Sequence, residues 1–334
     1  MTFVLKKGLI ICPLALILTV MATASLFAGH YPATFSELLS VITSTGKSDS
    51  ENTQMLSSII FELRLPRIFA AILVGAALSA SGAAYQSMFV NPLVSPGVLG
   101  VLSGGGVGAA IGIICGLSPF GIQLSTFGGG MTAVLGALFI ALIYRGDRLL
   151  LLVLGGVISG AFFTSILSLI KYAADPNDQL PAITYWLMGS LSGVGLNDIK
   201  TVLPLFIIGL LVLLSAGKAL NVLSLGEESK ALGINPQRLR LMMIAAATLL
   251  SITSVSIAGI IGWVGLIVPH IGRMLVGPDN RILLPVSAIL GGIILLLADN
   301  LSRTAFTVEI PLGITTSIFG IPMFVCFLRK SKGM

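Results

Sequence analysis

The chain has 334 residues, of which 55% are apolar and only 10% are charged, and its mean hydropathy is +1.04. So little polar surface cannot coat a water-soluble globule, which excludes a soluble enzyme or binding domain and indicates a polytopic membrane protein. The formal charge of +6 would suggest nucleic acid for a soluble chain, but here Lys and Arg flank apolar runs, as membrane topology requires. We therefore expect no nucleic-acid partner.

Ten apolar runs have the length of membrane-spanning helices or nearly so. A helix rising about 1.5 Å per residue needs about 20 residues to cross hydrocarbon, and the runs lack the alternation of a membrane β-barrel. The expected spans are 8–28, 66–86, 97–115, 120–144, 149–171, 200–219, 241–262, 264–276, 283–302 and 311–328. The sequence thus predicts an all-α polytopic membrane protein with ten transmembrane helices in a single domain, 1–334.

The first run, 8–28, allows an alternative. Lys6 and Lys7 precede it, and Ala22-Thr-Ala24 resembles the cleavage site of a secretory signal. However, the apolar core of a signal peptide has about 7–15 residues, whereas about twenty are found here. This length favours a retained first helix over a cleaved signal.

Basic residues set the expected orientation, because Lys and Arg collect on the cytoplasmic side. With the N-terminus inside, thirteen of the 19 Lys and Arg residues fall on the cytoplasmic side and six on the outer side. Ten crossings then place both termini in the cytoplasm.

Three arginines fall on the outer side, where basic residues are sparse. Arg64 and Arg67 flank the start of the second span, and Arg303 closes the ninth. Such fork-shaped donors pair well with carboxylates, so they are candidates for docking an extracytoplasmic protein. The alternative for each is snorkelling to lipid headgroups. Asp299, four residues before Arg303, is placed to neutralise it.

Two segments interrupt the helical pattern, 91–97 after the second span and 262–270 after the seventh. Irregular backbone at membrane depth persists only where it is buried in protein or lines a cavity, and paired breaks point to a translocation path. The residues expected to mark this path are Asn91, Pro92, Pro96, Gly97, Gly262, Gly265 and Pro269.

Many of the 39 glycines lie inside the expected spans, as in 104–106 and 128–130. Small residues let helix backbones approach closely in lipid, so we expect these glycines to serve helix packing rather than substrate contact.

Residues 221–240 form the one long polar segment. We expect a short helix over 225–232, a break at Gly233 and a restart after Pro236. Glu227, Glu228 and Lys230 are expected to be exposed on the short helix, and Arg238 and Arg240 follow the restart. Such a knob suits a groove in a soluble partner, whereas an ordinary solvated loop is the alternative.

The sequence shows no constellation for catalysis or metal binding. His30 and His270 fall far apart on the topology, and Gly46-Lys47-Ser48 imitates a phosphate-binding loop but has Val41 where its first glycine belongs. Cys12, Cys115 and Cys326 lie singly in apolar runs, which predicts small buried hydrophobic residues rather than metal ligands or disulfides. If ATP drives this protein, another chain must bind it.

A series of motifs runs in order from about residue 63 to 327. They include Arg64-Leu-Pro-Arg67, Asn91-Pro-Leu-x-x-Pro96-Gly, Tyr185-Trp-Leu-Met-Gly189, Leu225-Gly-Glu227, Gly262-x-x-Gly-Leu-Ile-Val-Pro-His270, Ala298-Asp299 and Ile310-Pro-Leu-Gly313. Together they resemble the FecCD-type permeases of ABC importers for iron-siderophores, haem and vitamin B12.

The resemblance implies a ten-helix type II importer subunit in the bacterial inner membrane, paired with a copy or paralogue of itself. It further implies two cytoplasmic ABC ATPases, which carry the ATP and Mg, and an extracytoplasmic binding protein that meets Arg64, Arg67 and Arg303. The path would lie at the dimer interface, lined largely by the fifth and tenth spans. The implied ATPase-coupling residues are Gly226, Glu227, Glu228, Lys230, Gly233, Pro236 and Arg238.

The resemblance favours a ferric siderophore as substrate and leaves haem, cobalamin and molybdate open. A secondary carrier is the rival from another class, and it would need titratable groups within the membrane. A membrane scaffold that transports nothing would leave the outer arginines and the helix breaks unexplained.

Overall fold

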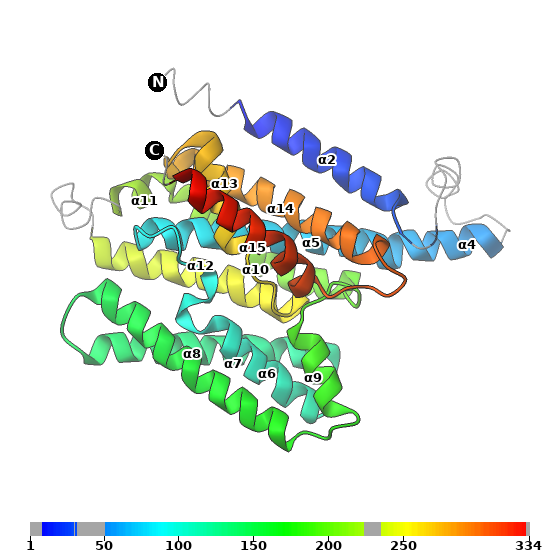
Figure 1. Ribbon diagram of the computed structural model, residues 1–334, viewed down its shortest axis with the longest axis horizontal. Coiled ribbons are helices and arrows are strands. Elements are labelled where there is room, and N and C mark those ends of the chain that lie inside the picture. Colours follow the sequence, from blue (N-terminus) through cyan, green and yellow to red (C-terminus); the bar gives the residue numbers. More distant parts are fainter. Residues whose placement is uncertain (1–8, 30, 32–50, 224–234, 332–334) are drawn as a thin grey trace.

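The computed structural model describes residues 9–29, 31, 51–223 and 235–331, and Figure 1 shows these as a bundle of helices. The described elements are α2 (Ile11–Phe27), α4 (Glu51–Ser58), the π-helix η1 (Ile59–Arg64), α5 (Leu65–Met88), the 3-10 turn η2 (Pro96–Leu99), α6 (Val101–Ile114), α7 (Pro119–Ile143), α8 (Arg148–Ala173), α9 (Gln179–Leu187), α10 (Leu196–Ser215), α11 (Gly217–Leu223), α12 (Pro236–Ala258), α13 (Val264–Val276), α14 (Asn280–Thr304) and α15 (Leu312–Ser331). The predicted all-α class is confirmed, since the described residues contain no strand.

Six helices among the described residues are long and apolar enough to cross a membrane unaided. They match the expected spans 66–86, 120–144, 149–171, 200–219, 241–262 and 283–302. The other four expected spans coincide with shorter apolar helices, namely α2, α6, α13 and α15. Each expected span therefore has a helix, and the number of full crossings stays a prediction.

Several boundaries differ from the predicted ones for local reasons. The second span continues backwards through η1 and α4, so that one apolar helix covers Gln54–Met88, 35 residues or about 52 Å. The third begins later, at Val101, because Gly100 takes φ +80° after η2. The seventh begins earlier, at Pro236, because the helix expected to restart there is continuous with this span. It ends at Ala258 because Gly259 takes φ +67°.

The three cysteines are exposed in the described structure, so their predicted burial is wrong. They lie on outward-facing sides of α2, α15 and the turn after α6. An apolar run in lipid does not imply burial in protein, because the surrounding solvent is itself apolar.

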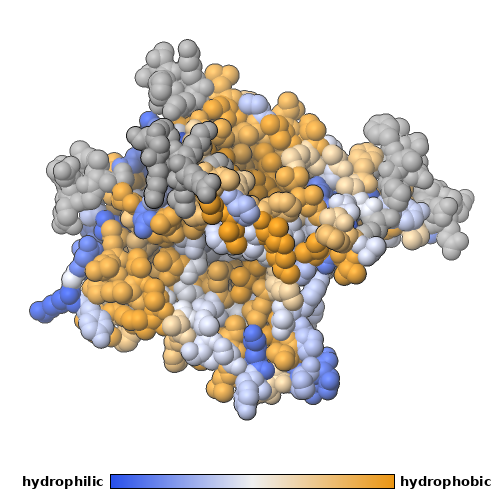
Figure 2. Space-filling model, in the orientation of Figure 1, coloured by the Kyte–Doolittle hydropathy of each residue, from blue (hydrophilic) through white to orange (hydrophobic). Residues whose placement is uncertain are grey.

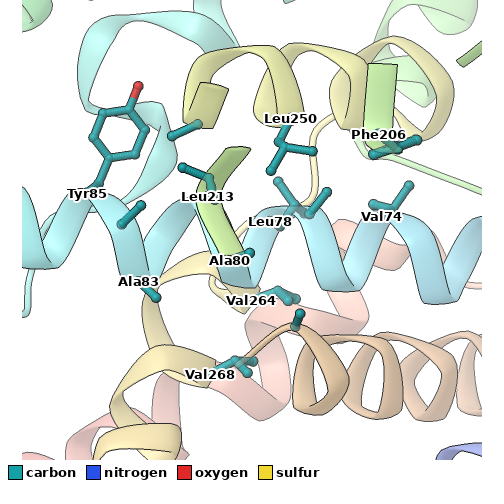
Figure 3. Packing of buried hydrophobic residues seen from close by; sticks show 14 of the residues in the cluster. Val74, Leu78, Ala80, Ala83, Tyr85, Phe206, Leu213, Leu250, Val264 and Val268 are labelled. Carbon is teal, nitrogen blue, oxygen red and sulfur yellow. The ribbon is translucent and has the colours of Figure 1, made fainter. Parts of the chain in front are cut away.

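The centre of the bundle consists of α5, α12 and α14. Between 72% and 78% of the residues in their most apolar windows are buried, against 22–28% for α7, α8 and α10. Figure 3 shows the packing at this centre, where Val74 and Leu78 of α5 meet Phe206 of α10 and Leu250 of α12. Figure 2 shows apolar side chains over much of the outer surface, as a lipid-facing protein requires.

Glycines set the closest helix approach at several contacts, which confirms their predicted packing role there. Gly128 is an exception, because a Cβ on it would meet nothing within 4 Å. A Cβ on Gly75 of α5 would lie 2.2 Å from the carbonyl oxygen of Gly291 on α14. A Cβ on Gly104 of α6 would lie 2.5 Å from the carbonyl oxygen of Gly129 on α7. A larger residue at either position would force the paired helices apart.

Candidate functional site

The three outer arginines gather at the end of the bundle where α5, α14 and η1 meet. Arg64, Arg67 and Arg303 are buried, with 5%, 8% and 5% of their surface exposed. Arg64 ends η1, Arg67 lies in the first turn of α5 and Arg303 lies in the last turn of α14, so the fold fixes their spacing. The side chains are not free at the surface, because each guanidinium is held within the chain.

Arg67 binds two carboxylates at once. Its Nε donates to both carboxylate oxygens of Asp299, at 2.9 and 3.1 Å, and its Nη1 donates to both oxygens of Glu309, at 2.9 and 3.0 Å. Asp299 has no exposed side-chain surface, whereas 32% of the Glu309 side chain is exposed. Of the two carboxylates, Glu309 is therefore the one that solvent or a partner can reach.

Arg303 and Arg64 anchor α2 to this cluster. Arg303 Nη2 donates to the backbone oxygen of Ser25 at 2.8 Å and to Asn300 Oδ1 at 2.6 Å, and its Nε lies 3.8 Å from Asp299. The predicted pairing of Arg303 with Asp299 is thus confirmed. Arg64 Nη1 donates to the backbone oxygen of Leu26 at 2.5 Å.

The two predicted helix breaks lie side by side. A Cβ on Gly265 would lie 2.7 Å from Pro96 Cγ, and Gly265 itself packs against Gly82 of α5. Gly97 is half-buried beside Pro96, and Pro269 is buried one turn along α13. Asn91 and Pro92 lie apart from this contact, on an exposed loop, and Gly262 has open space around it.

Each break also supports a different peripheral helix. A Cβ on Gly156 of α8 would lie 2.1 Å from the carbonyl oxygen of Val98, in the turn that follows the first break. In the second break Trp263 takes φ +67°, and its ring lies 6.2 Å from that of Phe324 on α15. The helices α8 and α15 are the fifth and tenth expected spans.

A junction that the sequence did not predict joins α9, α12 and α15. The amide of Ser190 donates to the carbonyl of Ala258 at 2.9 Å, and the amide of Leu312 donates to the carbonyl of Gly189 at 2.9 Å. Beside it lies a cavity of about 380 Å³, whose lining includes Tyr185, Trp186 and Ser192. The sequence contains the motifs 185–189 and 310–313, but it did not predict that the two segments contact each other.

At the opposite end of the bundle, a polar network fixes α11 to α14. Asn221 Oδ1 accepts from the backbone amide and the side-chain amide of Asn280, at 2.8 and 2.9 Å. Asn221 Nδ2 donates to Asp279 at 2.7 Å. The hydrogen bonds from Arg281 hold the pKa of Asp279 down at about 2, so this carboxylate stays charged.

The predicted coupling residues Gly226, Glu227, Glu228, Lys230 and Gly233 lie outside the described residues. Pro236 is buried as the first residue of α12, and Asn235 caps that helix by accepting from the amides of Gln237 and Arg238. The Arg238 side chain is exposed. Within the described ranges, no three His, Cys, Asp or Glu residues are grouped to hold a metal ion.

Comparison with known proteins covers nearly the whole chain. The chain is 37% identical over 322 residues to the molybdate import system permease protein MolB of Haemophilus influenzae, covering 96% of this chain and 95% of the relative. It is 39% identical over 291 residues to a probable iron chelatin transport system permease protein of Helicobacter pylori, covering 85% and 86%.

A solved structure agrees equally well. A metal-chelate type ABC transporter in an inward-facing conformation matches with a TM-score of 0.86 and 36% identity, covering 96% of this chain and 99% of that one. The sequence profile of the FecCD transport family matches residues 16–330. Because the family profile, the relatives and the solved structure all match most of the chain, the chain belongs to the FecCD transport family.

Proposed function

We propose that the chain is the transmembrane permease subunit of an ATP-driven importer that moves a metal chelate across the cytoplasmic membrane by alternating access. The observation that carries the proposal is the agreement, along 96% of the chain, with a metal-chelate type ABC transporter at 36% identity.

The helix breaks provide the moving parts of this proposal. The first supports α8 and the second supports α15, so a shift of α5 against α13 would reach both helices that we assign to the path. Because the contacts at Gly82, Gly265 and Pro96 leave no space for adjustment, a displacement of one segment must move its neighbour. The path itself would lie between this chain and a second copy or a paralogue.

The ATPases would act at the inner end of the bundle. Segment 221–240 begins in the last residues of α11, which Asn221 ties to the start of α14, and it ends in the first turns of α12. A push on this segment would therefore reach two of the three central helices directly. ATP and Mg belong to the ATPase subunits in this scheme, and no cofactor is assigned to this chain.

The binding protein would dock at the outer end, with its carboxylates directed to Arg64, Arg67 and Arg303. In the described structure Arg67 is already engaged by Glu309, the exposed member of the cluster. Docking would thus replace the Glu309 carboxylate on Arg67 with a carboxylate of the binding protein. Glu309 belongs to the connection between α14 and α15, so the exchange would release a segment that leads into the path.

A ferric siderophore is the substrate that we propose to test first. The relatives named above divide between an iron chelate permease at 39% identity and a molybdate permease at 37%, so identity alone does not choose between these substrates. Haem and cobalamin complete the set of candidates. A wide and weakly interacting conduit suits a hydrated chelate, which places the choice of ligand on the binding protein.

Uptake by proteoliposomes that contain the permease, its ATPase and its binding protein tests the proposal. Ferric siderophore uptake should require ATP inside the vesicles and should persist when the pH gradient is collapsed. Uptake that follows the pH gradient without ATP would favour a secondary carrier instead. Such a carrier would need a free titratable group, whereas Asp299 is paired with two arginines.

A further inference from the structure

Two adjoining cavities lie along α7 and α12. The larger has a volume of about 610 Å³ and is lined by residues of α7, α10 and α12. The smaller, of about 180 Å³, lies between the end of α7 and the starts of α8 and α12. Leu138, Leu241 and Ile244 line both, so the two cavities adjoin at these side chains, and we call the pair the groove.

The larger cavity is apolar throughout. The one hydroxyl in its lining belongs to Thr248, and that group already bonds to the Tyr85 hydroxyl at 2.7 Å. A cavity with no free polar partner does not hold ordered water. The groove also opens sideways, since 57% of Leu135 and 55% of Leu241 are exposed. Its natural occupant is a flexible apolar chain from the surrounding membrane.

The smaller cavity ends in a group of cationic and polar side chains. Arg148, Gln237 and Arg240 contribute to its lining. Among the residues that the structure describes, neither arginine has an ion-pair partner, and Arg240 Nε is buried without a hydrogen bond. The neighbouring carboxylate of Asp147 is occupied by the amides of Leu149 and Leu150, which it caps.

We propose that this groove binds one anionic phospholipid. The phosphate would lie on Arg148, Arg240 and Gln237, and an acyl chain would lie along α7 and α12. Two arginines that have no ion-pair partner within the described ranges, beside an apolar cavity, match the two chemical halves of such a lipid. Neither half alone accounts for the site, because a free phosphate would leave the 610 Å³ cavity empty and a neutral lipid would leave the arginines unpaired.

The position of the site gives the lipid a structural consequence. Gln237 and Arg240 lie in the first turns of α12, directly after segment 224–234. A bound lipid would therefore tie the start of α12 to α7 and α8. This inference concerns a binding site of the chain itself and holds whatever the chain transports.

Native mass spectrometry of the purified protein in mild detergent tests the proposal, with phosphatidylglycerol and phosphatidylcholine of identical acyl chains as probes. We expect one phosphatidylglycerol to be retained per chain in preference to phosphatidylcholine. The double variant Arg148→Gln, Arg240→Gln should lower retention about tenfold, because it removes both phosphate contacts. Arg145→Gln is the matched control, since this exposed arginine of the same turn does not line the groove.

A second variant separates the two halves of the site. Ala245→Phe places a ring in the larger cavity while leaving both arginines intact, and it should also reduce retention. It keeps the test decisive if the arginine variant fails to fold. Equal retention of both lipids, or unchanged retention in the variants, would overturn the proposal. So would loss of a dimer in Ala245→Phe, which would show that a second protein chain occupies the groove.

Discussion

At the scale of single residues, the outer arginines behave differently from an exposed docking patch. Their placement at one end of the bundle follows from the sequence, because each stands at the end of an expected span. The partners of these arginines do not follow from the sequence. Glu309 and Asn300 come into contact with them only through the packing of α14 and of the connection to α15. Arg67 and Glu309 are 242 positions apart, so their spacing in the sequence could not predict the ion pair.

Glu309→Gln should strengthen docking of the binding protein. The substitution keeps the shape of the side chain but removes the charge that competes for Arg67 Nη1. We expect the Kd of the binding protein to fall by about three- to tenfold, measured by titration onto the permease in nanodiscs. Glu62→Gln is the control, because Glu62 is exposed near the same end and has no ion-pair partner among the described residues. A weaker complex would show that Glu309 takes part in docking itself.

Asp299→Ala should destabilise the fold rather than alter docking alone. The change leaves Arg67 and Arg303 buried near each other with no fully enclosed carboxylate between them. Breaking a buried pair in this way costs about 3–5 kcal/mol. Thermal unfolding in detergent should show a marked loss of Tm, whereas the exposed Asp178→Ala should unfold as the unchanged protein does. An unchanged Tm for Asp299→Ala would contradict this account of the cluster.

At the scale of helices, the sequence predicts where apolar elements lie and fails where the chain leaves the bilayer. Runs of about twenty apolar residues identified a helix for each expected span. The continuation of α5 into η1 and α4 was missed, because the charged residues Glu62 and Arg64 interrupt the apolar run just before residue 66. The helix α9 was missed because it has only nine residues and follows a polar turn at 175–178, so its position depends on tertiary contacts at Gly189.

Gly75→Leu should prevent α5 and α14 from packing. A Cβ at this position would already collide with the backbone of Gly291, and backbone cannot move aside as a side chain can. We expect little folded protein after membrane extraction, judged by size-exclusion chromatography. The control is Gly128→Leu on α7, where a Cβ meets nothing within 4 Å. Equal yields of the two variants would mean that the α5 and α14 contact tolerates separation.

At the scale of the whole molecule, the chain has two polar ends joined by a central layer of α5, α12 and α14. Connections expected on one side of the membrane do gather at one end in Figure 1, where the α7–α8 turn lies on the same side as α11 and the end of α15. The sequence predicted this arrangement from the distribution of basic residues. It could not predict which helix faces are covered by protein and which by lipid, because both faces are apolar.

Labelling of single cysteines in a cysteine-free background tests the orientation. Arg145→Cys lies in the α7–α8 turn, and Asn177→Cys lies in the connection before α9, and both positions are exposed. A membrane-impermeant thiol reagent added to intact cells should label position 177 and leave position 145 unlabelled until the cells are lysed. The reverse pattern would invert the topology and place the coupling segment outside the cell.

The central claim is that an external ATPase drives this chain through segment 221–240. The most direct test compares ATP-dependent uptake by the reconstituted importer with and without the double substitution Glu227→Ala, Gly233→Pro, at equal amounts of folded permease. We predict that the variant loses both ATPase association and uptake. Unchanged uptake in the variant, or uptake by vesicles without any ATPase, would contradict the account.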